Sequence, residues 1–268
     1  MNDIFAGYGI LRREKMDIAK LEPPETDPYI DRSPWAPKAP FRMLVCGPSG
    51  SGKTNMVANL ICRYLHFDHL WFYSRHARQG KMKMLRQFFD QIRDCLVEES
   101  HGAIAPEEAD LMTIGDSLED VVPVDELPDA GQKLVVFDDF QTEKDQKVIE
   151  DYFVRGRHKR CSIIYLAQNY YQVPRPIRLN CSCVALFEVA SGTEASMLCR
   201  ELGLGLTRQE FMRMYTLATE EKYSFLFIDR NATDPVLKFR KRFDHLWWPA
   251  QFPPPKLPPP KNKDERGH

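Results

Sequence analysis

The stretch RMLVCGPSGSGKT, residues 42–54, decides the fold of this chain. Its first five residues predict a buried strand, and the eight that follow fit the pattern G-x-x-x-x-G-K-[ST]. The glycines at the first and sixth positions of this pattern allow backbone angles at which successive N–H groups point at phosphate oxygens. The pattern therefore predicts a phosphate-binding loop made of Gly47, Pro48, Ser49, Gly50, Ser51, Gly52, Lys53 and Thr54.

The last two residues of this loop carry the chemistry that a nucleoside triphosphate needs. Lys53 supplies positive charge for the β and γ phosphates of ATP, and the hydroxyl of Thr54 is placed to bind Mg2+. A helix is predicted directly afterwards, over 54–65, with an apolar face that can pack on a sheet and a dipole that favours the same phosphates. An ordinary glycine-rich turn is the alternative. The strand before the loop and the helix after it favour a site for ATP and Mg2+.

Two adjacent acids end a second apolar run, KLVVFDDF, residues 133–140. Asp138 would hold Mg2+ through water together with Thr54, and Asp139 would polarise the attacking water. A pair of capping acids at a strand end is the alternative interpretation. The 84 residues between Lys53 and Asp138 hold another predicted strand and helix. This spacing suits P-loop enzymes that have an extra strand between the two motif strands.

A neutral amide, Gln168, ends the next apolar run, SIIYLAQN. At that position it could sense the γ-phosphate or orient water, or it could simply be a strand-end hydrogen-bonding residue. Between the two runs, the sequence RGRHKR places Arg157 and Arg160 at a predicted helix-to-strand turn. An arginine there could reach a nucleotide bound by a neighbouring subunit. Contact with DNA and an ordinary basic turn are the alternatives.

Short apolar runs alternate with helical patterns along the chain, which predicts an α/β fold with a mostly parallel central sheet flanked by helices. The predicted strands cover 42–46, 69–74, 133–138, 162–167, 184–189, 223–228 and 236–243. The predicted helices cover 54–65, 81–93, 143–157, 193–202 and 207–217.

The organisation of the chain is read from composition. Residues 1–40 are proline-rich and predict an N-terminal arm, residues 41–248 predict one ATPase domain, and the Pro-rich residues 249–268 predict a disordered tail. Residues 98–130 hold eleven acidic residues and no Lys or Arg, and are expected to be an insertion. Seven cysteines without a C-x-x-C pair, and no stretch of about 20 apolar residues, predict a soluble intracellular protein without a membrane span.

The 37 Lys and Arg residues balance 38 Asp and Glu residues, but the charges are unevenly distributed. Three basic clusters, at 75–86, 155–160 and 238–242, lie outside the acidic segment. Either these are solvated faces, or they form a basic surface for a polyanion with the acidic segment set apart from it.

The strings GPSGSGKT, VVFDDF and RGRHKRCSIIYLAQNYYQVPRPIR together resemble the genome-packaging ATPases of poxviruses, other large DNA viruses, virophages and Polinton-like elements, in the FtsK–HerA branch of P-loop ATPases. The resemblance covers about 41–244. It implies a RecA-like core, a ring-shaped homo-oligomer, and translocation of double-stranded DNA, without sequence preference, into a preformed capsid. It also implies a capsid or portal partner and a location at sites of virion assembly in a host cell.

By motif, the resemblance makes Lys53 and Thr54 the phosphate-loop pair, Asp138 the metal acid, Asp139 the catalytic acid and Gln168 the strand-end sensor. Many ATPases of the wider superfamily have Glu where this chain has Asp139, so its shorter side chain must reach the water differently. No motif identifies which arginine would be the arginine finger, the residue that reaches the nucleotide of a neighbouring subunit.

Two other functions share the phosphate loop. A P-loop nucleotide or small-molecule kinase would need a basic lid, which Arg200, Arg208 and Arg213 could loosely imitate. A non-hydrolysing assembly factor would use ATP only as a structural ligand, but it has no need of a water-activating acid such as Asp139. The expected function is an ATPase that moves double-stranded DNA.

Overall fold

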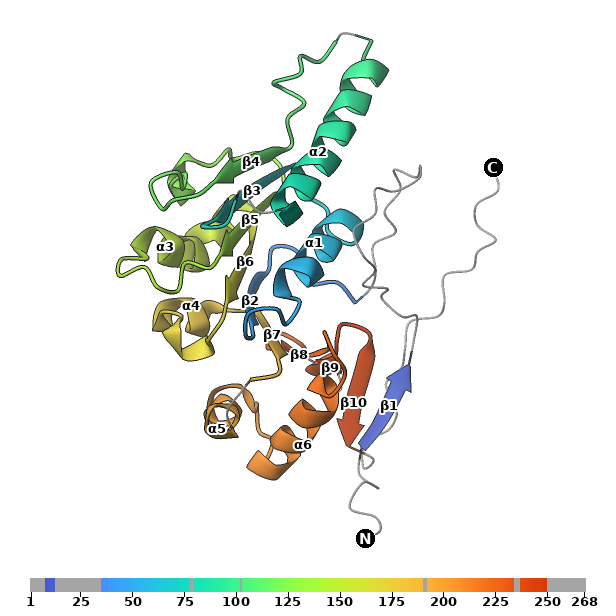
Figure 1. Ribbon diagram of the computed structural model, residues 1–268, viewed down its shortest axis with the longest axis vertical. Coiled ribbons are helices and arrows are strands. Elements are labelled where there is room, and N and C mark those ends of the chain that lie inside the picture. Colours follow the sequence, from blue (N-terminus) through green and yellow to red (C-terminus); the bar gives the residue numbers. More distant parts are fainter. Residues whose placement is uncertain are drawn as a thin grey trace, which may run out of the picture.

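The computed structural model describes residues 8–12, 35–77, 80–101, 103–189, 192–233 and 237–249. Within these ranges the chain forms one ten-stranded sheet in the order β1-β10-β9-β8-β7-β2-β6-β5-β3-β4. The six strands from β7 to β4 run parallel, and the strands on the other side of β7 are antiparallel (Figure 1). The predicted α/β fold with a mostly parallel sheet is confirmed.

The strands have short and well-defined bounds: β1 (Tyr8–Arg12), β2 (Arg42–Cys46), β3 (His69–Ser74), β4 (Met112–Gly115), β5 (Lys133–Asp138), β6 (Cys161–Ala167), β7 (Cys183–Phe187), β8 (Phe225–Asp229), β9 (Phe239–Lys241) and β10 (His245–Pro249). The helices are α1 (Lys53–Arg63), α2 (Gly80–Glu99), α3 (Lys147–Arg155), α4 (Arg175–Asn180), α5 (Gly192–Leu202) and α6 (Arg208–Thr219).

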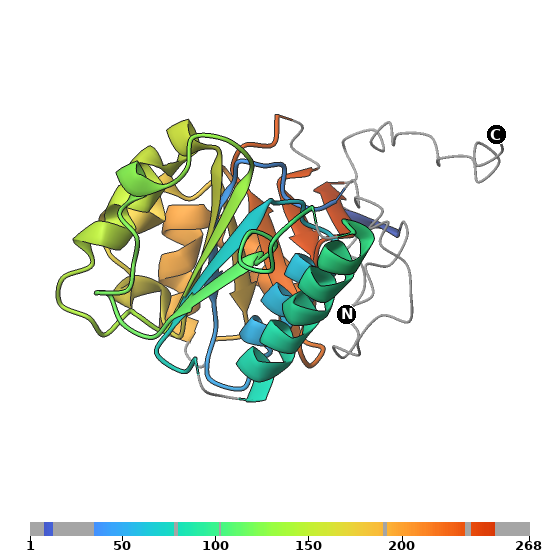
Figure 2. The ribbon, with the colours of Figure 1, turned by 90° about the horizontal axis from the view of Figure 1, so that it is seen from above.

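Helices cover both faces of the sheet because its central parallel strands are buried on both sides. All seven residues of β6 are buried, and their side chains alternate between two apolar cores. One core is packed by α1 and α2, and the other by α3, α4, α5 and α6. Figure 2, which looks along the sheet from above, shows α2 on one side of it and α3 on the other.

Most predicted elements occur within a few residues of their predicted bounds. The first three predicted strands are observed as β2, β3 and β5 with the same ends. Helix α3 begins at Lys147 rather than 143, because residues 140–143 form a turn in which the Glu143 N–H donates to the Phe140 carbonyl (3.0 Å). Helix α2 runs six residues beyond its predicted end.

The strands β1, β4 and β10 and the helix α4 were not predicted. β1 lies inside the predicted arm and pairs antiparallel with β10 at the other end of the chain. Trp35, also in the predicted arm, is buried in the core, and its carbonyl accepts a hydrogen bond from Arg240 Nη1 (3.1 Å). Residues 1–7 and 13–34 of the predicted arm and all but the first residue of the predicted tail lie outside the described residues.

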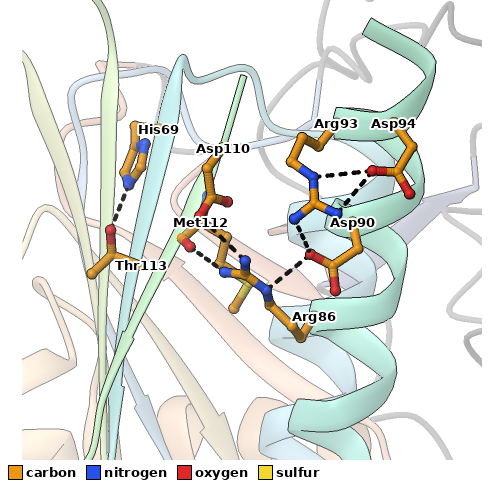
Figure 3. A network of polar contacts seen from close by, with 8 residues as sticks. All are labelled: His69, Arg86, Asp90, Arg93, Asp94, Asp110, Met112 and Thr113. Carbon is orange, nitrogen blue, oxygen red and sulfur yellow. Dashed lines mark hydrogen bonds and ion pairs between the residues drawn. The ribbon is translucent and has the colours of Figure 1, made fainter. Parts of the chain in front are cut away.

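The acidic segment 98–130 contributes the edge strand β4, which pairs in parallel with β3. Figure 3 shows how the segment is attached to α2. Arg86 of this helix donates hydrogen bonds to the Asp110 carboxylate (3.2 Å) and the Met112 carbonyl of the segment, and also to Asp90 of the same helix (3.1 Å). On the other side, His69 Nε2 lies 2.8 Å from Thr113 Oγ1. The segment is thus built into the sheet through β4.

The acidic segment also contacts two of the basic clusters, which corrects the alternative of a basic surface with the acidic segment set apart from it. Asp125 pairs with Arg155, and Asp129 pairs with Lys159 at 2.6 Å. Several basic residues of the clusters are therefore paired with acidic residues of the same chain, although the sequence alone could place them on a surface for polyanions.

Replacing Arg86 with methionine is expected to lower the free energy of unfolding by about 1–2 kcal/mol, because the Met112 carbonyl and the Asp110 carboxylate lose the hydrogen bonds that Arg86 of α2 donates to them. The matched control is Arg93→Met, since the ion-pair partners of Arg93 among the described residues, Asp90 and Asp94, lie on its own helix. Such local pairs contribute at most about 0.5 kcal/mol each. Urea unfolding measures both variants, and equal losses would contradict a special role for Arg86 in attaching β4.

None of the described helices is long and apolar enough to cross a membrane.

Candidate active site

The phosphate-binding loop connects β2 to α1 at the carboxyl edge of the parallel strands. Gly47 lies so close to β7 that an added Cβ would be 2.5 Å from Phe187 Cβ, so only glycine fits there. Gly52 caps α1 with φ +103°, a conformation that glycine adopts without strain. The Gly47 N–H donates to the Ala167 carbonyl at the end of β6 (3.2 Å). These contacts explain why the loop needs glycine at both motif positions.

The side chain of Lys53 turns back onto the loop. Its Nζ donates to the carbonyls of Gly47 (2.5 Å) and Pro48 (2.9 Å). Burial lowers the pKa of Lys53, and the nearby carboxylate of Asp138 acts in the opposite direction. The ammonium is thus held among oxygens that phosphate oxygens could replace.

Asp138 lies at the end of β5, beside the end of β3. Ser74 Oγ donates to its Oδ2 at 3.3 Å. Burial, and next the negative charge of Asp139, raise the pKa of Asp138 to about 6. Two carboxyl groups are therefore crowded together in a site where a cation would relieve the repulsion.

The raised pKa of Asp138 predicts a measurable pH dependence of stability. Between its ordinary value of 3.8 and about 6, the folded chain keeps a proton that the unfolded chain releases, so stability falls as pH rises through this window. A shift of this size corresponds to about 3 kcal/mol. In urea unfolding without nucleotide or Mg2+, Asp138→Asn should remove this loss and be more stable than wild type above pH 6. The control Asp145→Asn, at an exposed acid, should keep the wild-type pH profile, and a wild-type profile in Asp138→Asn would contradict the prediction.

Asp139 has φ +66°, an uncommon backbone conformation that Asp tolerates better than bulkier residues. Its Oδ1 accepts hydrogen bonds from Gln141 Nε2 (2.7 Å) and Gln168 Nε2 (3.0 Å), and its Oδ2 lies 3.1 Å from His76 Nε2. The Gln168 N–H in turn donates to Gln141 Oε1 (3.2 Å). Three side chains from three loops thus fix the orientation of this carboxylate.

A cavity of about 470 Å³ brings the predicted residues together. It is lined by Ser49, Gly50, Gly52, Lys53, Thr54, Asp138, Asp139 and Gln168 from the predicted set, and also by Asn55, Met56, His76, Lys81, Leu166, Ala167 and Tyr223. Gly47, Pro48 and Ser51 belong to the same loop without lining the cavity.

The two predicted arginines do not line this cavity. Arg157 and Arg160 are exposed and precede β6, whereas Gln168 follows β6 at its other end. The seven residues of β6 span about 23 Å. The two arginines therefore lie at the amino ends of the parallel strands, whereas the cavity lies at their carboxyl ends. Within one chain they lie away from the cavity, so their predicted role toward the nucleotide of a neighbouring subunit stays a prediction.

Sequence reasoning did not identify Ser74, His76, Gln141 or Tyr223. No motif contains them, and their only shared signal is a position within two residues of a strand end or of Asp139. The arginines considered for a kinase lid, Arg200, Arg208 and Arg213, do not line the cavity.

Comparison with known proteins adds a family and a fold. A family model described as Poxvirus A32 protein matches residues 35–231 of the chain. No protein with a curated description matches it.

Two solved structures are similar to this chain. B204, the DNA-packaging ATPase from Sulfolobus turreted icosahedral virus, has a TM-score of 0.51 and 10% sequence identity, over 76% of this chain and 97% of that one. The genome packaging NTPase B204 from Sulfolobus turreted icosahedral virus 2, in complex with AMP, has a TM-score of 0.48 and 14% identity, over 75% and 96%.

Proposed function

The chain belongs to the poxvirus A32 protein family, as its motifs indicated, and from this premise we propose that it hydrolyses ATP and uses the energy to move double-stranded DNA into a preformed viral capsid. The observation that carries the proposal is the single cavity lined by Lys53, Thr54, Asp138, Asp139 and Gln168. An assembly factor that only binds ATP would not need an oriented water-activating carboxylate.

The residues at the cavity fit a magnesium-bound triphosphate. Thr54 supplies a hydroxyl and Asp138 a carboxylate, which are oxygen donors of the kind that Mg2+ prefers. Among the described residues, Ser51 Oγ is buried in the loop without a hydrogen-bond partner. When bound, Mg2+ would neutralise charge that develops on the phosphates.

Three residues at the cavity would then have separate roles in hydrolysis. Lys53 would exchange the carbonyls of Gly47 and Pro48 for β- and γ-phosphate oxygens. Asp139 would orient the attacking water and take up its proton, because its carboxylate is held in place by the neighbouring side chains. Gln168 would sense the γ-phosphate, since its amide contacts Asp139 and also lines the cavity.

Arg157 or Arg160 would act on the nucleotide of a neighbouring subunit in a homo-oligomeric ring, since both lie at the far edge of the sheet from their own cavity. DNA would be gripped through its phosphate backbone and without sequence preference. A capsid or portal protein would hold the ring at the site of virion assembly.

The proposal is tested by steady-state ATP hydrolysis with and without long duplex DNA, at increasing salt. We expect stimulation by duplex that falls steeply with salt. Hydrolysis that is indifferent to DNA at all salt concentrations would contradict a simple DNA motor. Binding of ATP without any hydrolysis would favour an assembly factor.

A further inference from the structure

Tyr223 is a large aromatic residue that lines the proposed ATP cavity without a role in the chemistry described above. It lies in the turn between α6 and β8, its φ is +65°, and 55% of its surface is exposed. A left-handed backbone is a genuine outlier for a bulky residue, and such outliers cluster at functional sites.

The turn that carries Tyr223 is tied to β9, so the ring is presented by a fixed backbone. Glu221 accepts hydrogen bonds from Lys241 Nζ and Arg242 Nη2, both at 2.9 Å, and the Ser224 N–H donates to the Glu221 carbonyl at 3.0 Å. The ring also lies against the phosphate-binding loop, since a Cβ added at Gly52 would be 3.1 Å from Tyr223 Cδ1.

The order of the strands places Tyr223 and the catalytic acid on opposite sides of the phosphate-binding loop. β7 and β8 lie on one side of β2, whereas β6, β5 and β3, which precede Gln168, Asp139 and His76, lie on the other. The γ-phosphate must lie on the side of Asp139 for hydrolysis. The nucleoside part of the ligand then extends toward the side of Tyr223.

We infer that Tyr223 is the platform on which the nucleobase of the bound nucleoside triphosphate stacks, an inference that rests on the proposed ATPase function. An exposed aromatic ring offers a π-face to any base. Lys222 Nζ now lies 4.9 Å from the ring centroid. A cation–π contact at an exposed site is weak, and a base can replace it.

The test compares binding of ATP and of inorganic tripolyphosphate, each with Mg2+, by titration calorimetry on the full chain. Tyr223→Ala should weaken ATP binding about tenfold, the size of one lost base–aromatic stack, and leave tripolyphosphate binding unchanged. Tyr223→Phe, which keeps the ring, should bind both ligands like wild type. The matched control is Leu204→Ala, at another exposed residue with positive φ outside the cavity.

Unchanged ATP binding in Tyr223→Ala would overturn the inference. Equal weakening of ATP and tripolyphosphate would overturn it as well, because the residue would then act through the phosphate-binding loop at Gly52. The variant Lys53→Ala distinguishes a failure of the proposed ATP site from a failure of the stacking platform. If it binds both ligands like wild type, the proposed ATP site itself is wrong. If it loses both while Tyr223→Ala behaves like wild type, only the stacking platform is wrong.

Discussion

Replacing Asp139 with asparagine is expected to reduce ATP hydrolysis by about 10²–10⁴-fold while ATP binding stays within a few fold of wild type. Asparagine has the same shape, and its Oδ1 can still accept hydrogen bonds from Gln141 and Gln168. It has no carboxylate to take up the proton of the attacking water. Steady-state phosphate release in the presence of duplex DNA measures the loss, and calorimetric titration with ATP measures binding.

The matched control for this variant is Asp145→Asn, the same change six residues further along the chain. Asp145 is exposed, and its carboxylate accepts a hydrogen bond from the backbone of Lys147 (3.0 Å). We expect wild-type hydrolysis in the control. Full activity in Asp139→Asn would exclude Asp139 as the base, and another group at the cavity would then have to take up the proton.

The residues of the cavity differ in how far the sequence could predict them. Asp138 ends the apolar run of β5, and Lys53 and Thr54 follow β2 at fixed positions of the loop motif, so both the element and the position of each residue could be predicted. Gln141 contacts Asp139 from within the same turn, but His76 reaches it only because the turns after β3 and β5 fold toward each other. A contact between residues 63 positions apart depends on strand pairing, which a local pattern does not record.

The edges of the sheet could not be predicted for a similar reason. β4 is a four-residue run, MTIG, inside the most acidic part of the chain, and it becomes a strand by pairing with β3. β1 pairs with β10, more than 230 residues away. Both edges are fixed by partners distant in sequence, whereas central strands such as β2 carry their own burial signal.

Replacing Arg157 and Arg160 together with alanine is expected to reduce DNA-stimulated hydrolysis by about 10³-fold or more, with ATP binding unchanged, if a finger from the neighbouring subunit completes each site. Both side chains are exposed and about 23 Å of strand separates them from their own cavity, so an action on ATP would have to be on the nucleotide of a neighbouring subunit. The matched control is Arg155→Ala, because Arg155 is already paired with Asp125 and Asp151. It should hydrolyse ATP within about twofold of wild type, as expected for loss of surface ion pairs.

Mixing two inactive variants tests the trans arrangement directly. A Lys53→Ala subunit binds no phosphate but still carries both arginines, whereas the double arginine variant keeps its own cavity intact. In mixed rings, some cavities of the arginine variant would face a neighbour that supplies the missing guanidinium, so hydrolysis should recover to a substantial fraction of wild type. Recovery requires that the arginine and the cavity come from different chains, which only an oligomer provides. If the mixture stays inactive while both variants bind duplex DNA and assemble, the finger lies elsewhere in the chain.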